Sequence, residues 1–422
     1  MRPVSETSVP TRTVQLHRDS NDRLPPARQV FYVAPDDPWA RWTNSGISAR
    51  LTRGLLDRNL LAGAISRNAR FAMNLLSPPP TSRWRRKLMD SPLFRRGSHW
   101  RNEGQGAIGR RLRRLPEGAS VLYHYVYPEH DDTLPIRRFL LQDLAAGQAH
   151  ERAAFGHTDP SRREADMERQ RTQNLAADGT ISFGNFVGEA FEADYGIPRS
   201  RVTAIGCGPI LRPSGLPQTD LARYRRRRLL FVGRDWERKG GPLLLEAFSL
   251  LRDVFPDATL TVVGVRDREI DAPGVRQIPF ATGRDLERLF LEASAFCMPS
   301  ECETWGLVYS EAAHLATPIV GFREWALPDI VLDGITGLIA EERSAAGLAA
   351  SLIEAFEDPE QLQSMGQAAL VYARESLDWP VVLDRLQAAM LPETWSGDTP
   401  LPLGAVPAAL ETAPVLPSRR AA

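Results

Sequence analysis

Apolar runs and amphipathic segments alternate along most of the chain. In the first half, strand-type runs are predicted at residues 29–34, 60–66, 120–127, 137–141, 179–183 and 201–205, and helices at 45–58, 160–177 and 185–195. Either Ser45 or Asn44 is expected to cap the first helix. Strands that alternate with helices are typical of parallel βαβ units. The first half is therefore predicted to be an α/β domain with a parallel sheet.

The same alternation restarts after a stretch rich in glycine and proline. Strands are predicted at residues 228–232, 259–263, 295–298 and 318–321, and helices at 240–255, 284–292, 306–315, within 343–375 and at 379–389. The expected fold class is α/β, with two Rossmann-like domains that face each other across a cleft. Open α/β sheets bind ligands beyond the carboxyl ends of their strands, so the cleft is the expected site.

These patterns divide the chain into six parts, consistent with a length of 422 residues. We expect a disordered arm at 1–27, an N-terminal domain at 28–207 with a basic insertion at about 78–115, a linker at 208–222, a C-terminal domain at 223–377, a helix at 378–391 and a disordered tail at 392–422.

Charge is unevenly distributed although the net charge is zero. Residues 1–130 carry 22 Lys and Arg against 10 Asp and Glu, and the remainder carries 30 against 42. The basic excess, densest in residues 83–114, could meet an anionic membrane surface, a phosphorylated acceptor or nucleic acid, or could be a solvated insertion. Aromatic residues are not interleaved as in known nucleic-acid modules, so no nucleic-acid partner is expected.

Several features indicate the compartment. No stretch approaches the roughly 20 apolar residues that a membrane-spanning helix needs, and the first 28 residues lack the apolar core of a secretory signal. The three cysteines, Cys207, Cys297 and Cys302, favour a reducing compartment over a disulfide framework. The sequence predicts a cytoplasmic protein, with peripheral attachment to the inner membrane as a further expectation.

Two glutamates, Glu303 and Glu311, flank the loop that becomes the helix near Gly306. The first backbone N–H groups of a helix lack intrahelical partners and, with the helix dipole, favour an anion such as a diphosphate. Glycine at position 306 would let the backbone approach that ligand closely. The alternative is a surface helix whose early acidic residues only complement its dipole.

A second loop, Gly233 to Gly240, follows a predicted strand and leads into a helix. Arg234 and Lys239 within it could converge on one pair of phosphates. The chain has 50 arginines and only two lysines, so a lysine at 239 hints at a site that needs a compact ammonium. The alternative is a solvated basic turn.

From Leu229 to about Leu386 the sequence resembles the C-terminal domain of GT-B glycosyltransferases, specifically the retaining family four, also called glycosyltransferase group 1. The matching segments are Phe231–Arg234, Lys239–Gly240, Leu245–Phe248, Val262–Gly264, Pro299–Ser300, the two-glutamate motif, Thr317–Val320, Pro328–Gly334, Gly337 and Trp379. The resemblance implies a GT-B fold whose C-terminal helix, starting near Trp379, crosses back to the first domain.

The resemblance also implies roles for individual residues. Arg234 and Lys239 would pair with the donor diphosphate, Glu303 would bind sugar hydroxyls and Glu311 the ribose. The donor-binding set implied in this way is Gly233, Arg234, Lys239, Glu303, Trp305, Gly306, Leu307, Val308 and Glu311. Because cations and the helix end supply positive charge, no metal and no cofactor are expected beside the nucleotide-sugar.

The first half matches the family less closely. Ser45 and Gly46 resemble its acceptor-side loop, but Gln142 and Asp143 stand where many members have a histidine beside the transferring carbon. His124, at the end of the preceding strand, is the other candidate catalytic residue, with a structural role as its alternative. A second departure is Trp325-Ala326, where the family commonly has two glycines near the donor.

The implied function is transfer of a sugar, expected to be a hexose, from a nucleoside-diphosphate sugar to a saccharide, lipid-linked or small-molecule acceptor, with retention and without metal. The alternative from another class is a catalytically inactive scaffold that binds sugar or nucleotide, which the two departures motivate. A nucleotide-sugar epimerase is a third reading, with no support in the spacing of the glutamates.

Overall fold

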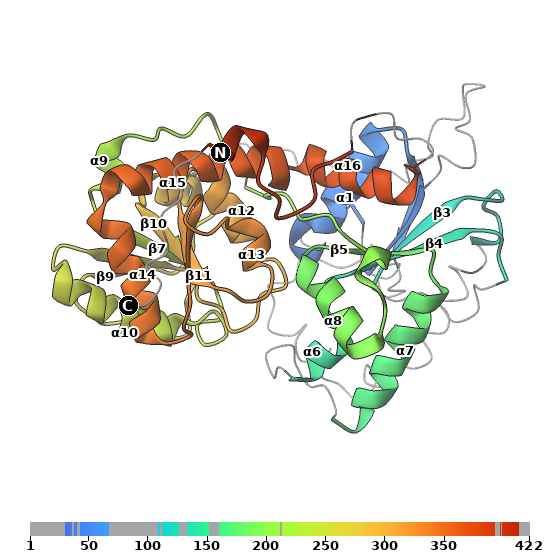
Figure 1. Ribbon diagram of the computed structural model, residues 1–422, viewed down its shortest axis with the longest axis horizontal. Coiled ribbons are helices and arrows are strands. Elements are labelled where there is room, and N and C mark those ends of the chain that lie inside the picture. Colours follow the sequence, from blue (N-terminus) through green and yellow to red (C-terminus); the bar gives the residue numbers. More distant parts are fainter. Residues whose placement is uncertain are drawn as a thin grey trace, which may run out of the picture.

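The structure, a computed structural model, describes residues 30–35, 38–39, 43–66, 109, 112–125, 133–151, 160–211, 213–392, 397 and 399–412. Two α/β domains lie beside each other, with the first in blue to green and the second mostly in yellow to orange (Figure 1). The predicted arm at 1–27 lies outside the described residues, as does most of the predicted basic insertion at 78–115. Leu112, near the end of that insertion, is buried against the first sheet.

The N-terminal domain is built on a parallel sheet of six strands in the order β2-β1-β3-β4-β5-β6. The strands are β1 (Val30–Ala34), β2 (Leu61–Ser66), β3 (Ser120–His124), β4 (Arg137–Gln142), β5 (Gly179–Ser182) and β6 (Val202–Ala204). The helices are α1 (Ile47–Asp57), α6 (Ala146–Glu151), α7 (Arg163–Ala176) and α8 (Asn185–Tyr195), with short helices η2 (Thr43–Gly46), η4 (Pro160–Arg162) and η5 (Arg199–Arg201). Strand β1 is buried along its whole length, as its unbroken apolar run predicts.

The C-terminal domain repeats this architecture with the strand order β12-β11-β10-β7-β8-β9. Its strands are β7 (Arg228–Val232), β8 (Thr259–Val263), β9 (Val275–Ile278), β10 (Ala295–Cys297), β11 (Ile319–Phe322) and β12 (Gly337–Ala340). Its helices are α9 (Leu221–Tyr224), α10 (Gly241–Val254), α11 (Arg284–Glu292), α12 (Leu307–His314), α13 (Leu327–Ile330), α14 (Ala345–Glu357), α15 (Pro359–Tyr372) and the π-helical turn η6 (Ala373–Leu377). The fold class is as predicted: α/β, with two parallel six-stranded sheets.

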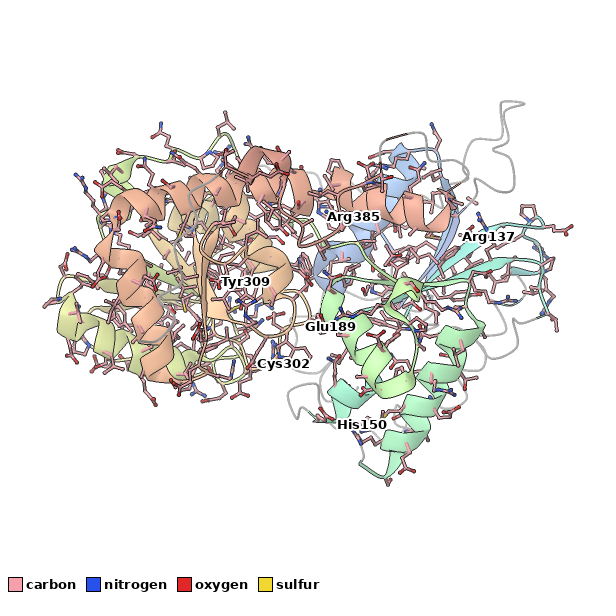
Figure 2. All side chains as sticks on the ribbon, in the orientation of Figure 1. Arg137, His150, Glu189, Cys302, Tyr309 and Arg385 are labelled. Carbon is pink, nitrogen blue, oxygen red and sulfur yellow. The ribbon has the colours of Figure 1, made fainter. Side chains whose placement is uncertain are left out.

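Helix α16 (Trp379–Met390) crosses back to the first domain, as expected. It contacts α1, β5 and β6 of the N-terminal domain, and Figure 1 shows it beside α1. Its first residue is held at the domain boundary, because Trp379 Nε1 donates to the carbonyl of Pro209 at 2.9 Å. Figure 2 labels Arg385 on the same helix, and the Arg385 guanidinium donates to the carbonyl of Ile205 at 3.1 Å.

The expectation of a disordered tail from residue 392 is wrong for residues 399–412. Leu403 and Leu410 are each only 6% exposed, and Leu410 belongs to a short helix, η8 (Ala408–Leu410), that contacts α15. The carbonyl of Leu401 accepts a hydrogen bond from Arg385 at 2.8 Å. This segment therefore folds against both domains, while residues 413–422 lie outside the described part.

A buried carboxylate also joins the two domains. Asp329 of α13 accepts hydrogen bonds from the backbone N–H of Asn185 at 2.7 Å and from its side-chain amide at 2.6 Å. Asn185 begins α8, so the carboxylate sits where a helix dipole favours negative charge. The amide of Asn185 also donates to the carbonyl of Leu403 at 3.2 Å. We call Asp329, Asn185 and Leu403 the interdomain latch.

Within the described residues, none of the helices has the length and apolar character required to span a membrane.

Candidate donor and acceptor site

Loop 233–240 connects β7 to α10 and packs against the loop after β10. Gly240 is the N-cap of α10 with a φ of 73°, and a Cβ there would overlap the carbonyl of Pro299. Only glycine tolerates both the positive φ and this close approach. The approach sets Lys239 beside Glu303, which lies between β10 and α12.

Lys239 and Glu303 form an ion pair between Nζ and Oε2. Their side chains are 13% and 16% exposed, so both charges are largely withdrawn from water. Burial and the adjacent Arg238 guanidinium lower the pKa of Lys239, while Cys302 and Asp235 act in the opposite direction. Arg238 lies 3.9 Å from the same carboxylate oxygen. Lys239, Glu303 and Arg238 thus gather charge at the carboxyl end of the second sheet.

The start of α12 adds backbone donors beside this pair. Gly306 is its N-cap with a φ of 74°, and a Cβ there would come within 2.9 Å of Glu303 Cγ. The N–H groups of Leu307 and Val308 lie in the first turn, where a helix offers them no acceptor. Their side chains pack against the core, so only their backbone faces a ligand. Together with Lys239, the start of α12 forms a positively polarised end suited to an anion.

Arg234 is the least fixed of the predicted residues. It follows Gly233 at the end of β7, and its side chain is exposed. Within the described part of the chain, no hydrogen bond or ion pair holds its guanidinium. A Cβ on Gly233 would lie 3.0 Å from Lys239 Cγ, so the backbone leading to Arg234 runs beside Lys239. The structure thus brings Lys239, Glu303 and Gly306 together and leaves the Arg234 side chain open to solvent.

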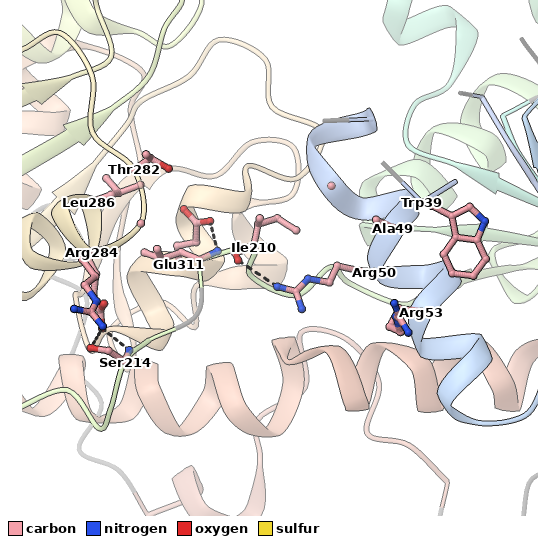
Figure 3. Close-up of a pocket in the computed structure, with 14 residues that line it drawn as sticks. Trp39, Ala49, Arg50, Arg53, Ile210, Ser214, Thr282, Arg284, Leu286 and Glu311 are labelled. Atoms are coloured by element: carbon pink, nitrogen blue, oxygen red, sulfur yellow. Dashed lines mark hydrogen bonds between the residues drawn. The ribbon is translucent and has the colours of Figure 1, made fainter. Parts of the chain in front are cut away.

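A cavity of about 650 Å³ opens between α1 of the first domain and α11 and α12 of the second (Figure 3). Glu311 lines it, is 7% exposed and accepts a hydrogen bond from the Leu211 N–H at 2.9 Å. Burial raises the pKa of Glu311 from 4.5 to about 7, although the Leu211 N–H favours the carboxylate. Gly46 lines the same cavity from the first domain, so the predicted acceptor-side loop faces Glu311.

Ser45 and Gly46 adopt a different local structure from the one predicted. Gly46 is the N-cap of α1 with a φ of 90°, and no side chain makes a capping hydrogen bond there. Ser45 has a φ of 54° and is exposed. The prediction that Ser45 or Asn44 caps the helix is therefore wrong, because the chain enters α1 through a left-handed turn.

Three arginines that motif analysis did not single out also line this cavity. Arg50 and Arg53 come from α1, and Arg284 begins α11. Figure 3 shows Arg50 pointing toward Ile210, whose carbonyl accepts its hydrogen bond at 3.3 Å. The sequence signal was present as a pair of arginines three residues apart on one helix, but nothing in the pattern linked it to the second domain.

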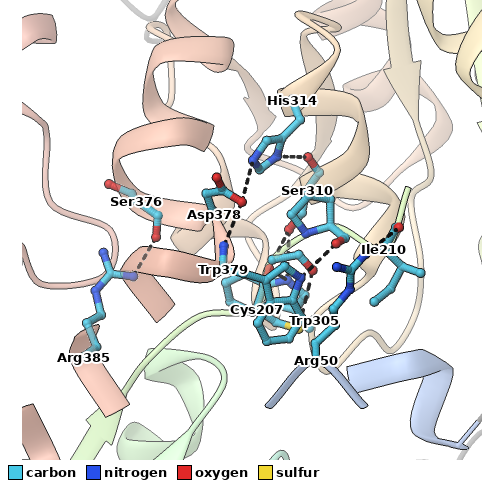
Figure 4. A network of polar contacts seen from close by, with 12 residues as sticks. Arg50, Cys207, Ile210, Trp305, Ser310, His314, Ser376, Asp378, Trp379 and Arg385 are labelled. Atoms are coloured by element: carbon cyan, nitrogen blue, oxygen red, sulfur yellow. Dashed lines mark hydrogen bonds and ion pairs between the residues drawn. The ribbon is translucent and has the colours of Figure 1, made fainter. Parts of the chain in front are cut away.

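Trp305 has its side chain away from the cavity. Its ring is 3% exposed, and Nε1 donates to the carbonyl of Cys207 at 2.9 Å and lies 3.0 Å from the hydroxyl of Ser310 (Figure 4). The Ser310 hydroxyl donates to the same carbonyl at 3.0 Å. The Trp305 side chain therefore anchors the linker, and only its backbone remains near the predicted donor-binding position.

Two of the three polar candidates of the first domain, His124 and Gln142, are engaged in its interior. His124 is 1% exposed and its Nδ1 lies 2.8 Å from the Tyr32 hydroxyl. Gln142 is 3% exposed, and its amide donates to the Tyr125 carbonyl and accepts from Gln170. These contacts hold both side chains within the sheet.

Asp143 differs from its two neighbours. It is half-buried and accepts a hydrogen bond from the Tyr125 hydroxyl at 3.3 Å. Burial raises the pKa of Asp143 to about 6, which puts its titration near neutral pH. Of the three candidates, it is the one that keeps an exposed fraction and a pKa suited to proton transfer.

Trp325 fills the space beside Glu303. It has a φ of 54°, and its Nε1 donates to the carbonyl of Glu301 at 2.9 Å. Its ring meets Phe186 of α8 edge to face, with centroids 5.6 Å apart. A pocket of about 10 Å³ between Trp325, Glu303 and Tyr309 is all that remains there. The departure at 325 thus places a cross-domain aromatic contact next to the predicted sugar position.

Among the described residues, no group of three or more His, Cys, Asp and Glu side chains is arranged to hold a metal ion.

Comparison with known proteins agrees with this geometry in the second domain. Residues 220–371 match the family model described as glycosyl transferases group 1. A D-inositol 3-phosphate glycosyltransferase of Pseudarthrobacter chlorophenolicus is 35% identical over 163 residues, which cover 35% of this chain and 39% of that protein. The chain aligns with about two fifths of the length of the curated relatives it matches.

Solved structures extend the likeness to both domains. Sucrose-phosphate synthase from Thermosynechococcus elongatus has a TM-score of 0.63 at 16% identity, covering 86% of this chain and 98% of that chain. HepE of Anabaena, solved with UDP and glucose, has a TM-score of 0.55 at 12% identity, covering 87% and 99%. The two described domains therefore have the GT-B fold, and residues 220–371 match the family model of the glycosyl transferases of group 1.

Proposed function

We propose that this protein transfers a sugar from a nucleoside-diphosphate sugar, held by the C-terminal domain, to an acceptor held by the N-terminal domain. The observation that carries the proposal is the Lys239–Glu303 pair at the start of α12. A cavity lined by both Glu311 of α12 and Gly46, one from each domain, opens on the same helix. A donor whose nucleoside occupies that cavity has its diphosphate directed toward the N–H groups of α12.

The proposed chemistry depends on charge that develops during the reaction. As the glycosidic bond breaks, negative charge builds on the leaving diphosphate. Lys239 and the N–H groups of Leu307 and Val308 stabilise that charge, and they are already oriented before the donor binds. Glu303 holds Lys239 in place and accepts hydrogen bonds from sugar hydroxyls. Independence from metal is part of the proposal, since cations and helix donors supply the positive charge. Transfer with retention of the anomeric configuration is a further part of the proposal.

The comparisons narrow the first substrates to test. HepE was solved with UDP and glucose, so UDP-glucose is the first donor, followed by GDP- and ADP-sugars. The inositol 3-phosphate relative carries a phosphorylated polyol in its name, so phosphorylated polyols belong among the acceptors tested, with saccharides and lipid-linked saccharides. A thermal-shift screen with free UDP, GDP and ADP identifies the base before turnover is measured.

The test is the turnover of the variants Lys239→Ala and Glu303→Ala. Each is expected to lower kcat by at least about tenfold, as the loss of one transition-state contact does, while the protein stays folded. Exposed Arg288→Ala on α11, whose ion pairs are all at the surface, is the matched control and keeps normal turnover. Near-normal turnover in both site variants would refute the assignment.

A second candidate function is a scaffold that binds donor without turnover. The engagement of His124 and Gln142 in the sheet interior favours it, since neither is free to act in proton transfer. Release of nucleoside diphosphate from a bound donor separates the two functions. Binding without release across the acceptor panel would favour the scaffold.

Attachment to an anionic membrane surface is the remaining part of the proposal. The basic cluster at 83–114 lies largely outside the described residues, so membrane attachment is supported by composition alone. Sedimentation with anionic vesicles at low salt tests it, and a protein that stays in the supernatant there would argue against attachment.

A further inference from the structure

A second cavity, of about 800 Å³, lies behind the linker and away from Glu303. Residues of α1, the linker at 209–216 and the segment 374–383 line it, so both domains contribute. We call it the hinge groove. It shares Arg50, Arg53, Leu211 and Ser214 with the cavity beside Glu311, but not Gly46 or Glu311. His314, Arg374 and Asp378 line only the hinge groove, so a ligand held by these three residues would lie beside the proposed donor site and not in it.

Arginines face the hinge groove from both domains. Arg53 comes from α1 and Arg374 from η6, and both are exposed. Within the described residues, neither has an ion pair or a hydrogen bond. Arg58 also lines the groove, but its charge is balanced by Asp384 at 2.7 Å. The arginines that line the groove outnumber its two carboxylates, Asp57 and Asp378, so the groove attracts an anion.

His314 supplies an observation of a different kind. It is 7% exposed, and its Nδ1 lies 2.7 Å from the carbonyl oxygen of Ser310 (Figure 4). A carbonyl only accepts, so Nδ1 carries the hydrogen, and in the neutral ring Nε2 is an acceptor. Nε2 has no hydrogen-bond partner, although His314 lines the groove. A buried polar atom without a partner is uncommon and calls for an explanation.

The nearest charged group does not satisfy His314. Asp378 Oδ1 lies 4.0 Å from Nε2, beyond hydrogen-bond distance, and already accepts from the Trp379 N–H at 2.8 Å. Burial lowers the pKa of His314 and Arg374 acts in the same direction, while Asp378 acts against them. Neutral His314 and Asp378 thus present two acceptors to one corner of the groove. Such a corner is complemented by a group that donates O–H.

From the free arginines, the unsatisfied imidazole and the shape of the groove, we infer that the hinge groove binds a small phosphorylated sugar. The phosphate lies against Arg374, and sugar hydroxyls donate to His314 Nε2 and Asp378. The ring of Trp379, which also lines the groove, offers an apolar wall for the face of the sugar. Because the groove is lined by α1 and by η6, the ligand contacts both domains at their junction.

Binding is tested with glucose 6-phosphate, inorganic phosphate and glucose as probes, by calorimetry on the full chain with the donor site saturated by UDP. Glucose 6-phosphate is expected to bind more tightly than either of the other two. Arg374→Ala is expected to weaken glucose 6-phosphate and phosphate by at least about tenfold, the effect of one lost charge-assisted hydrogen bond. Arg288→Ala, an exposed arginine on α11, is the control and leaves the affinity unchanged.

A second variant separates the contribution of the sugar to binding from that of the phosphate. His314→Gln is expected to weaken glucose 6-phosphate and to leave inorganic phosphate unchanged, because only the hydroxyl contact is altered. The inference is overturned if glucose 6-phosphate shows no saturable binding in the presence of UDP. It is also overturned if Arg374→Ala binds like Arg288→Ala, or if phosphate binds as tightly as the sugar phosphate.

Discussion

Replacing Glu311 by glutamine tests how much a buried negative charge in the cavity beside α12 lowers the free energy of unfolding. The glutamine keeps the shape of the side chain and can still accept the Leu211 N–H bond, but it carries no charge. Burial raises the pKa of Glu311 from 4.5 to about 7, so the folded protein binds the proton more tightly than the unfolded chain does. The stability from this group is therefore present below pH 4.5 and is lost as the pH rises to about 7.

The size of the effect follows from the same pKa values. The pKa of Glu311 differs by about 2.5 units between the folded and the unfolded state, which corresponds to about 3 kcal/mol. Above pH 7 the ionised Glu311 lowers the free energy of unfolding by this amount. Glu311→Gln is expected to match the wild type at about pH 4 and to exceed its free energy of unfolding by about 3 kcal/mol at pH 8. Denaturant titrations at a series of pH values measure this difference.

The same substitution should weaken the proposed donor. A carboxylate that accepts ribose hydroxyls is replaced by a neutral amide, and we expect UDP to bind roughly tenfold more weakly. A variant that is more stable at pH 8 but binds UDP less well would show that the charge is kept for binding and not for folding. Parallel stability curves for the two proteins from pH 5 to pH 8 would refute the reasoning.

Two further predictions concern the loops and the interdomain latch. Gly240→Ala is expected to lower the free energy of unfolding by more than the about 1–2 kcal/mol that an alanine in the left-handed region costs, because its Cβ would overlap Pro299. Gly196→Ala, with a φ of 65° and open space around the Cβ, is the control that shows the conformational cost alone. Equal losses for the two variants in denaturant titrations would contradict this prediction. Asp329→Ala leaves the Asn185 N–H unpaired, so we expect a loss of about 2–3 kcal/mol and a larger radius of gyration by X-ray scattering, and an unchanged radius would mean that the latch does not hold the domains together.

The sequence predicted most strands and helices where one local signal dominates. Strands β7 and β8 and helices α8 and α11 have the predicted bounds, because each is a continuous apolar run or a clear helical pattern between glycines and prolines. The edge strand β9 (Val275–Ile278) was missed, since its side chains are intermediate or exposed and its sequence mixes apolar and polar residues. Residues 399–412 were missed for a related reason: Leu403 and Leu410 pack from irregular chain, which has no period to detect.

The candidate site was predictable only in part. Lys239, Glu303 and Gly306 lie in short motifs whose spacing fixes their positions at strand and helix ends, and the structure brings them together. The burial of His124 depends on Tyr32, which is distant in sequence, so no local pattern could separate a catalytic histidine from a supporting one. Arg50 and Arg53 of α1 line the cavity only because the two domains lie side by side. The periodicity of a sequence does not predict how two domains are placed, so these residues could not be identified from it.

The manner in which Trp305 anchors the linker defines where the two domains can turn. Ile205 and Gly206 donate backbone hydrogen bonds to Ser182 and Phe183 of the first domain, whereas Cys207 and Leu211 are bonded to Trp305 and Glu311 of the second. The backbone partners of the chain thus change from one domain to the other at Gly206, which has a φ of 76°, although Arg50 of α1 still donates to the Ile210 carbonyl.

The chain returns from the second domain to the first at Asp378, a single residue in an extended conformation between η6 and α16. The tail crosses a third time beside Gly206, where a Cβ would lie 3.2 Å from Leu403. A rotation of one domain against the other would therefore have to be taken up at Gly206, at Asp378 and at the contact with Leu403 together.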